Sequence, residues 1–383
     1  MAAAMLLAPF ADEWLGFLPF GALEQIRADA ALTYAEAGAV LAMMYAGGLA
    51  GNLFSIAADY VSRRALAALG ALGVALAMTA FAVADSFWML AAAAFAWGAA
   101  CDAFEAGCEV ALVDLAGDAL PRVLARANAW AAVGDLLGPA SLIAAAALGL
   151  GWRGLLLASA AVMLAYAAWL ARLRLPPPSP PEHIANPFAG VIAVLRDPRV
   201  LLLALLDGLF GLLDEPLLGF AIAYLERVRG LSPEAAVALA MSAVVGGLAG
   251  YLWAGRAARA EPTPRTLTTA AGGLCLALPA MVYAPWVPLQ AAGGLAFGFT
   301  GAVFYAALQA KILMLRPGQA GSVSAVISLT GAAGLLYPAL VGAASDRFGL
   351  AAGLALYAAI PLALLALAAA SAPTSFIRRD HGL

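Results

Sequence analysis

Long apolar runs alternate with short polar breaks along the whole chain. A run of about 20 apolar residues is long enough to cross a lipid bilayer as an α-helix. The pattern predicts transmembrane helices over residues 5–26, 34–57, 65–83, 88–115, 124–149, 154–173, 200–224, 233–254, 266–284, 287–312, 321–344 and 349–371. The sequence therefore predicts an all-α integral membrane protein with twelve transmembrane helices, and an even number places both termini on the same side.

The longest polar break, residues 174–199, divides these helices into two sets of six. It contains Pro176, Pro177, Pro178, Pro180 and Pro181. We expect an N-terminal six-helix bundle over 1–174, a Pro-rich linker over 175–199, and a C-terminal bundle with a short tail over 200–383. The second part of the linker, residues 186–199, could form an interfacial helix.

Composition agrees with a membrane protein. Of 383 residues, 64% are hydrophobic and 11% are charged, whereas soluble domains carry about 25% charged residues. The net charge of −3 offers no basic footprint, so we expect no nucleic-acid partner. Three cysteines, an odd number, lie inside apolar runs and indicate no disulfide framework. The first apolar run lacks a basic flank and carries two acids, so we interpret it as a mature helix rather than a signal peptide.

Basic residues predict the orientation. Fifteen of the 20 Lys and Arg residues fall in breaks on the side of the termini, and five fall on the other side, namely Arg27, Arg153, Arg227, Arg229 and Arg347. Because basic residues favour the cytoplasmic side, we expect both termini in the cytoplasm and a multi-pass protein of the cell (inner or plasma) membrane.

The two halves repeat several features in the same order. Asp12-Glu13 and Glu24 recur as Asp214-Glu215 and Glu226, offset by 202 residues. The run Gly-Gly-Leu-Ala-Gly at 47–51 recurs at 246–250, and Pro139 recurs as Pro338, both offset by 199. Two six-helix copies share one orientation, which is the parallel repeat of some transporters. We interpret the glycine runs as close-packing sites between helices.

Residues 55–64 resemble the loop 2–3 signature G-x-x-x-D-R-x-G-R-R of the major facilitator superfamily. Asp59, Arg63 and Arg64 match it, while Ser, Tyr and Ser replace the first Gly, the Arg and the second Gly. Together with the two six-helix halves and the long central loop, this resemblance covers essentially the whole chain. It implies a secondary transporter in which helices one, four and seven line a central cavity and Asp59, Arg63 and Arg64 form a gating network.

Two further segments are similar to exporters of this superfamily. Gly134-x-x-x-Gly138-Pro139 matches part of a motif of antiporters, and the first helix with its following loop is similar to bacterial drug-efflux members. The resemblance favours export.

Acidic residues inside the apolar runs are the candidate functional site, because ionisable groups in a membrane are costly and usually functional. They are Asp12, Glu13, Asp102, Glu105, Glu109, Asp135, Asp207, Asp214 and Glu215. Lys311, the only lysine, is the main candidate for a basic partner at depth. Most of these acids must therefore be protonated, face water or meet a cation.

Some acids have a structural alternative. The helix-end acids Glu24, Asp114 and Glu226 fit solvated or capping roles, and Asp135 could bond to a neighbour such as Asn128. The aromatic residues of the apolar runs are more typical of helix packing, although a few could line a pocket for an organic cation.

We expect a monomeric, proton-coupled secondary transporter that works by alternating access and moves a small cationic or lipophilic substrate. It would use no cofactor and would not be an enzyme. An alternative is a divalent metal-ion transporter (Mn, Fe or Mg) with Asp102, Glu105, Cys108 and Glu109 as ligands, since carboxylates suit such ions. A remote alternative is a non-transporting membrane sensor.

Overall fold

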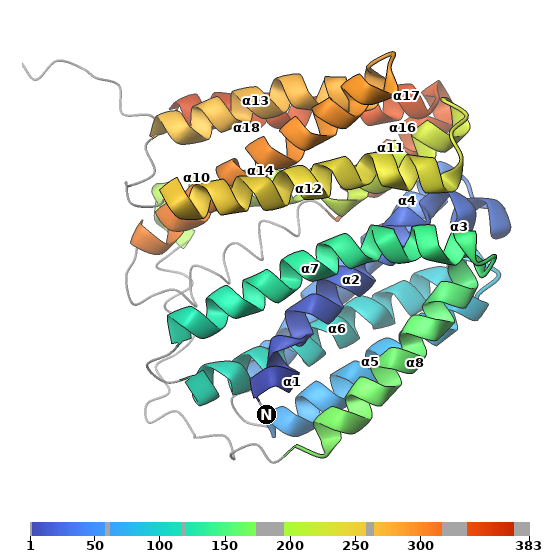
Figure 1. Ribbon diagram of the computed structural model, residues 1–383, viewed down its shortest axis with the longest axis vertical. Helices are drawn as coiled ribbons and strands as arrows, with labels where there is room; N and C mark the ends of the chain where they lie inside the picture. The colour runs from blue at the N-terminus through green and yellow to red at the C-terminus, as the bar shows by residue number, and fades with distance from the viewer. Residues whose placement is uncertain are drawn as a thin grey trace, which may run out of the picture.

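The computed structural model describes residues 2–57, 62–116, 120–173, 195–257, 264–315 and 335–370. Every regular element within these ranges is helical (Figure 1). The helices before the central linker are α1 (Ala2–Leu6), α2 (Ala8–Gly21), α3 (Leu23–Asp29), α4 (Tyr34–Ala57), α5 (Arg63–Val83), α6 (Phe87–Ala116), α7 (Leu120–Ala147) and α8 (Gly151–Ala171). The helices after it are α10 (Pro198–Gly211), α11 (Glu215–Arg227), α12 (Pro233–Ala257), α13 (Pro264–Tyr283), α14 (Val287–Leu315), α16 (Tyr337–Phe348), α17 (Leu350–Ala355), a 3₁₀ turn (Leu356–Ala358) and α18 (Ala359–Ala370).

Eight helical segments of the described residues are long and apolar enough to cross a membrane. They agree with predicted spans to within a few residues: 63–83, 87–112, 129–147, 151–171, 233–254, 265–283, 287–312 and 350–370. The other predicted spans fall on α1 to α3, on α4, on α10 and α11, and on α16. Residues 316–334, which include the first part of the predicted span 321–344, lie outside the described residues, so the count of twelve stays a prediction.

The continuous helices predicted over 5–26 and 200–224 are wrong, because both segments are broken. The first is interrupted at Leu7 and at Ala22. The second is interrupted between Gly211 and Glu215, where Pro216 lies in the first turn of α11 and lacks the N–H that a continuous helix needs. The break in the second segment adjoins the acidic dipeptide Asp214-Glu215, whereas Asp12 and Glu13 lie within α2.

Within each half, one long helix packs against two others in the same way. The helix α6 packs against α4 and α5, and its counterpart α14 packs against α12 and α13. Glycine permits this approach, because a Cβ on Gly47 would collide with the carbonyl oxygen of Phe95, and one on Gly246 with that of Leu295. The prediction that the repeated glycine runs are close-packing sites is confirmed. The division at residue 174 stays a prediction, since residues 174–194 lie outside the described ranges.

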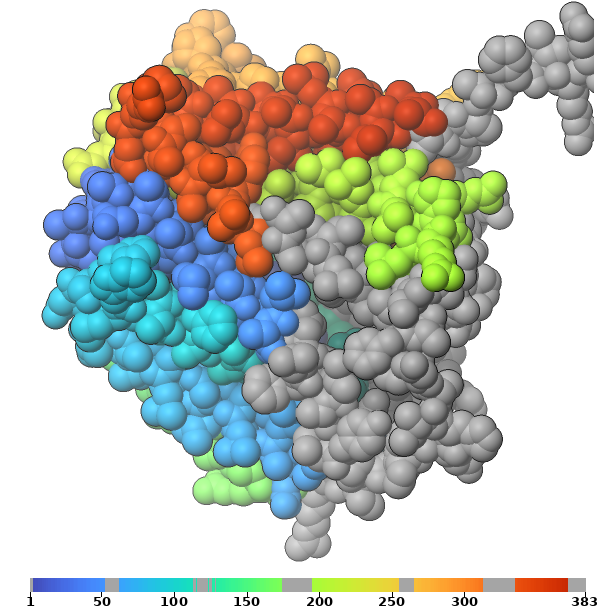
Figure 2. All heavy atoms as spheres, turned by 180° about the vertical axis from the view of Figure 1, so that it is seen from behind, coloured from blue at the N-terminus to red at the C-terminus, as the bar shows by residue number. Residues whose placement is uncertain are grey.

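The two halves meet tightly at one end of the bundle, here called the closed end, where α3, α4, α11 and α16 come together (Figure 1). A Cβ on Gly38 would collide with the backbone of Pro338, and one on Gly342 with the backbone of Tyr34, so α4 and α16 pack backbone to backbone. Figure 2 shows the blue N-terminal helices against the orange-red C-terminal ones on the back face. The N-terminus lies at the opposite end (Figure 1), where, among the described residues, α1 packs mainly against α2, α6 and α7, and α10 mainly against α14 and α18, all helices of the same half.

Candidate functional site

Two cavities lie between the halves, one on each side of the break that separates α10 from α11. The first, here called the α12-side cavity, has a volume of about 380 Å³ and is lined by α2, α7, α10, α11, α12 and α14. The second, the α4-side cavity, has a volume of about 410 Å³ and is lined by α2, α4, α6, α10, α11 and α16. Asp207 and Gly211 line both. Volumes of this size suit a small organic molecule.

The repeated dipeptide of the first half divides its two acids between the cavities. Asp12 and Glu13 are adjacent on α2, so their side chains leave the helix about 100° apart. Asp12 lines the α4-side cavity, where it accepts a hydrogen bond from the Cys101 thiol (2.8 Å). Glu13 lines the α12-side cavity together with Asp135 on α7, whose carboxyl group lies nearby.

The acids of α6 share a face, as their spacing predicts, but they differ in surroundings. Asp102 lines the α4-side cavity, beside Gly48. The carboxyl group of Glu105 lies close to that of Asp12. Glu109, one turn further along, is exposed, and Cys108 is buried (1% exposed). The structure therefore brings Asp102 to the cavity, places Glu105 behind it beside Asp12, and leaves Glu109 outside.

The acids of the second half lie at the break between α10 and α11. Asp207 accepts a hydrogen bond from the Gln309 amide on α14 (2.9 Å). Asp214, the N-cap residue of α11, faces the α12-side cavity, while Glu215 faces the α4-side cavity and accepts a hydrogen bond from the Tyr45 hydroxyl (3.1 Å). The second dipeptide is thus also divided between the two cavities, with the opposite assignment: its Asp lines the α12-side cavity and its Glu lines the α4-side cavity.

Within the described residues, none of the nine predicted acids forms an ion pair with a basic side chain. The ion pairs found there lie at the closed end and join Glu24 to Arg27 and to Arg227, and Arg153 to Asp29 and to Asp85. The residues lining the two cavities likewise include no Lys or Arg among those described. Two carboxylates held close together repel each other unless a proton or a cation neutralises one of them, and this applies to Asp12 with Glu105 and to Glu13 with Asp135.

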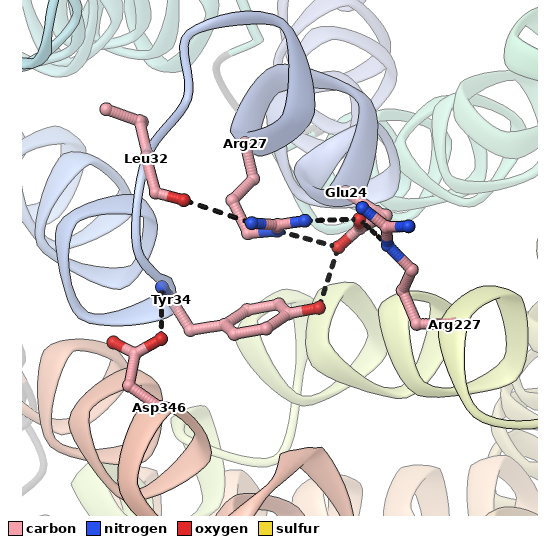
Figure 3. Close-up of polar contacts among 6 residues, drawn as sticks. All are labelled: Glu24, Arg27, Leu32, Tyr34, Arg227 and Asp346. Carbon is pink, nitrogen blue, oxygen red and sulfur yellow. Dashed lines mark hydrogen bonds and ion pairs between the residues drawn. The ribbon is translucent and has the colours of Figure 1, made fainter.

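Glu24 is the centre of a polar network at the closed end (Figure 3). Its carboxylate accepts hydrogen bonds from the guanidinium of Arg27 (3.0 and 2.8 Å), from the Tyr34 hydroxyl (3.0 Å) and from Arg227 of the other half. The expectation of a solvated Glu24 is wrong: the residue is 5% exposed, because α3 and α11 cover it. The sequence did not reveal this, since helix ends of distant segments meet only in the folded chain.

Glu226 lies next to this network, beyond the predicted span 200–224. Burial and the charge of Glu24 raise the pKa of its carboxyl group to about 7. Its Oε1 is buried and has no hydrogen-bond partner among the described residues. Glu226 is therefore not the solvated group that its position at a helix end indicates.

The predicted gating residues are only partly described. Asp59 lies outside the described residues, so its network with the two arginines stays a prediction. Arg63 begins α5 and is buried, whereas Arg64 is exposed and donates to the carbonyl oxygen of Leu173. The side chains of Asp114 and Asn128 also lie outside what the structure describes. No group of three or more His, Cys, Asp and Glu side chains among the described residues is arranged to hold a metal ion.

Sequence reasoning missed two tyrosines of the site. Tyr45 bonds to Glu215 and Tyr251 lines the α12-side cavity. Tyr45 lies two residues before the first glycine run and Tyr251 directly follows the second, so the repeat itself carried a signal. The break between α10 and α11 also had a signal in the sequence, since Gly211 and Pro216 flank it.

A helical bundle of two similar halves, with a charged cavity between them and membrane-length helices around it, defines a multi-pass membrane transporter. A sequence model described as Major Facilitator Superfamily matches residues 3–339. The chain belongs to the Major Facilitator Superfamily, whose members carry small molecules across the lipid bilayer. No curated protein sequence matches the chain.

Solved structures share the fold at low sequence identity. A point mutant of the nucleoside transporter NupG has a TM-score of 0.79 at 12% identity, covering 96% of this chain and 98% of that one. A bacterial homolog of the human lysosomal transporter Spinster, inward-facing and occupied, has a TM-score of 0.72 at 18% identity, with 96% and 94% covered. A D-xylose–proton symporter has a TM-score of 0.74 at 14% identity, with 96% of each chain covered. At these identities the likeness concerns the fold.

Proposed function

We propose that the protein is a proton-coupled secondary transporter that moves a small cationic or lipophilic substrate by alternating access, with export favoured. The observation that carries this proposal is the set of acids at the centre of the bundle, which line two cavities without basic partners among the described residues. A cation or a proton must balance such charges in a medium of low dielectric constant.

The two carboxyl pairs suit exchange of a proton for a cation. Asp12 lies close to Glu105, and Glu13 to Asp135, and two neighbouring carboxylates in a low dielectric need a proton or a cation to neutralise one of them. A cation that enters either cavity supplies the positive charge that a proton had supplied, so the proton can leave. Coupling of this kind needs no nucleotide and no cofactor.

The closed end supports alternating access. Contacts of α3, α4, α11 and α16 close one end of the bundle, whereas at the other end the main contacts of α1 and α10 among the described residues are with helices of their own half. With both termini in the cytoplasm, as the basic residues favour, this arrangement is an inward-facing state in the plasma membrane. Tests should include nucleosides and sugars, because structures with the same fold are named as nucleoside and D-xylose transporters.

The test is transport in proteoliposomes with an imposed pH gradient. Ethidium, choline, uridine, D-xylose and Mn²⁺ are compared side by side, with and without a protonophore. We expect ethidium or choline to move against its gradient, and the protonophore to stop it. The proposal would be contradicted if only uridine or D-xylose were transported, or if cation transport did not depend on the pH gradient.

A triple variant tests the acids directly. The variant combines Asp12→Asn, Glu105→Gln and Asp214→Asn, so it neutralises both members of the first carboxyl pair and one further acid of the cavities. We expect it to lose proton-driven transport. The matched control is Asp85→Asn, which removes an acid of the closed end that lines neither cavity. Unchanged transport and pH dependence in the triple variant would rule out a carboxylate site.

The metal alternative, with Asp102, Glu105, Cys108 and Glu109 as ligands, has less support. Cys108 is buried and Glu109 is exposed, so the four side chains do not share one environment. Saturable Mn²⁺ flux that ethidium and choline do not inhibit, and that Cys108→Ala and Glu109→Gln abolish, would favour it over the cation exchanger.

A further inference from the structure

One acid of the cavities is bonded across the boundary between the two halves. Glu215 of α11 accepts a hydrogen bond from the Tyr45 hydroxyl of α4 (3.1 Å). By contrast, the hydrogen bonds that Asp12 and Asp207 accept each come from a residue of the same half. Of these three hydrogen bonds, only the one to Glu215 depends on how the two halves are placed.

The second carboxyl oxygen of Glu215 also faces the N-terminal half. It lies against Gly16 of α2, where an added Cβ would come within 3.2 Å of Oε1 and force the carboxyl group to shift. Asp12 precedes Gly16 by four residues, so it lies on the same face of α2, and it lines the same cavity. Tyr45 and Gly16 thus form a seat for the carboxyl group, here called the Glu215 seat, with Asp12 beside it.

The helix α11 connects the Glu215 seat to the closed end. Glu215 is its first residue, and Arg227, which pairs with Glu24 of the other half, is its last. One turn after the seat, Gly219 approaches α2 so closely that a Cβ would lie 2.8 Å from the carbonyl oxygen of Phe20. Helices move as units in transitions of this kind, so separation of Arg227 from Glu24 also withdraws Glu215 from its seat.

The surroundings of the seat contain acids and no base among the described residues that line the cavity. The helices α3 and α12, which also pack on α11, place Glu24 and Glu234 at its other end, near Glu226. A seated carboxyl group therefore needs a proton or a cation, whereas water can solvate its charge once it is withdrawn. The titratable groups nearest to Glu215 are Tyr45 of α4, Asp12 of α2, Asp102 of α6, Asp135 of α7, Asp207 of α10 and the adjacent Asp214.

We propose that Glu215 couples protonation to closure of the closed end, and that Tyr45 and Gly16 are positioning residues that hold its neutral carboxyl group against the N-terminal half. Opening of the closed end withdraws Glu215 into water, where it exchanges its proton. Closure then requires that the proton, or a cation in its place, is bound. This inference rests on the proposed function and names the contact that regulates the same site.

The pH dependence of the closed end tests this coupling without a transport substrate. Spin labels are attached through Ala28→Cys on α3 and Ala235→Cys on α12, two exposed positions on opposite halves. The distance between the labels, measured by double electron–electron resonance in lipid nanodiscs, gives the closed and open fractions. We expect the closed fraction to rise on acidification from about pH 8.5 to about pH 5.5, because the protonated carboxyl group returns to its seat.

The background of this experiment removes competing signals. Cys101→Ser keeps a hydrogen-bond donor beside Asp12, and Cys108→Ala and Cys275→Ala remove the other thiols. Glu226→Gln is included as well, since burial and the charge of Glu24 raise the pKa of Glu226 to about 7 at the closed end. The remaining pH dependence then comes from the site.

Glu215→Gln mimics the protonated acid, so this variant should stay closed at both pH values. Tyr45→Phe should lower the ratio of closed to open protein roughly two- to tenfold, the value of one hydrogen bond, and Glu215→Ala should cancel that effect, because the two residues act through one contact. The matched control is Tyr283→Phe, whose hydroxyl bonds to the carbonyl oxygen of Ala351 within one half.

A second pair of variants tests the seat if Tyr45→Phe does not fold. Gly16→Ala crowds the carboxyl group and should also lower the closed fraction, whereas Gly272→Ala, where a Cβ would meet no atom within 4 Å, should not. The assignment would be overturned if Glu215→Gln kept the pH dependence of the parent. It would also be overturned if the effect of Tyr45→Phe persisted with Glu215→Ala, or if the control variants opened the closed end equally.

The two failures are distinguishable. If the pH gradient drives ethidium or choline but the closed end responds to pH equally with Glu215→Gln, the assignment of Glu215 is wrong and the transport function stands. If the closed end responds to pH through Glu215 and Tyr45 but the gradient drives no cation, the assignment stands and proton-coupled cation transport is wrong.

Discussion

Arg227, the last residue of α11, forms an ion pair with the buried carboxylate of Glu24 in α3. This pair joins the C-terminal half to the N-terminal half at the closed end (Figure 3). Arg27 binds the same carboxylate from within the N-terminal half. Glu24 therefore keeps one basic partner when the halves separate, and only the contact with Arg227 depends on their closure.

We expect Arg227→Gln to favour opening of the closed end. Cys101 lines the α4-side cavity and reports this opening in a Cys108→Ala, Cys275→Ala background. A membrane-impermeant maleimide added at the closed-end face should label Cys101 about two- to fivefold faster. This range corresponds to the free energy that a partly exposed ion pair contributes. Arg153→Gln is the control, since Arg153 pairs with Asp29 and Asp85 inside one half. Equal acceleration in both variants would show that the contact between the halves has no special role.

Asp346 should stabilise the bundle through a helix cap that crosses between the halves. Its carboxylate in α16 accepts the backbone N–H groups of Tyr34 and Ala35 at the start of α4 (2.8 Å each). Asp346→Ala should lower stability by about 0.5–2 kcal/mol, the usual effect of losing an N-cap. Asp346→Asn retains one acceptor oxygen, so its stability should lie between those of the parent protein and Asp346→Ala. Thermal unfolding in detergent measures the order, and identical melting temperatures for all three proteins would contradict it.

The repeated glycine run should tolerate alanine at one position and not at its neighbour. A Cβ at Gly246 would collide with the Leu295 carbonyl oxygen, whereas one at Gly247 would lie 3.9 Å from the Gly298 carbonyl oxygen. Gly246→Ala should therefore cost about 1–3 kcal/mol through overpacking, and so should Gly47→Ala in the other half. Gly247→Ala is the control. The melting temperatures of the variants test this prediction. Equal melting temperatures for Gly246→Ala and Gly247→Ala would contradict it.

Stability should depend on pH through Glu226. Burial and the nearby Glu24 raise the pKa of Glu226 to about 7, from an ordinary value of 4.5, while Arg227 opposes the shift and Glu234 adds to it. The folded protein thus holds this proton more tightly than the unfolded chain does. That contribution is fully present below pH 4.5 and is lost as the pH rises towards 7.

Glu226→Gln should consequently raise the melting temperature at pH 8 and leave it almost unchanged at pH 4.5. Glutamine mimics the protonated acid, so the variant no longer bears the buried charge at high pH. Thermal unfolding at both values is the measurement, and the low-pH comparison is the internal control. A variant that is less stable than the parent at the higher pH would show that the charged carboxylate is the favoured form.

Much of the architecture could be predicted because the bilayer restricts it. A chain with so few polar residues must satisfy its backbone hydrogen bonds within helices, and span length follows from bilayer thickness. The glycine runs were interpretable for a similar reason: only glycine lets two helix backbones touch. The orientation, the number of spans and the division at residue 174 remain predictions.

The site was predictable as a set of residue types and not as an arrangement. Acids in apolar helices are costly and therefore conspicuous in a sequence, and seven of the nine candidates line the two cavities, although their function stays a prediction. Their partners were not, because Asp12 meets Glu105 and Glu13 meets Asp135 across more than ninety residues. The burial of Glu24 could not be predicted for the same reason, because the residues around it belong to three helices that are far apart in sequence.

The sequence by itself determined a membrane bundle of helices with repeated landmarks and a surplus of buried acids, because hydropathy and charge are local properties. Tertiary structure decided that the repeated Asp-Glu dipeptides divide between two cavities, that Asp207 lines both, and that Glu24 joins the halves. These features depend on helix breaks and on contacts between distant segments. Their free energy arises only when the segments meet, so no local pattern records them.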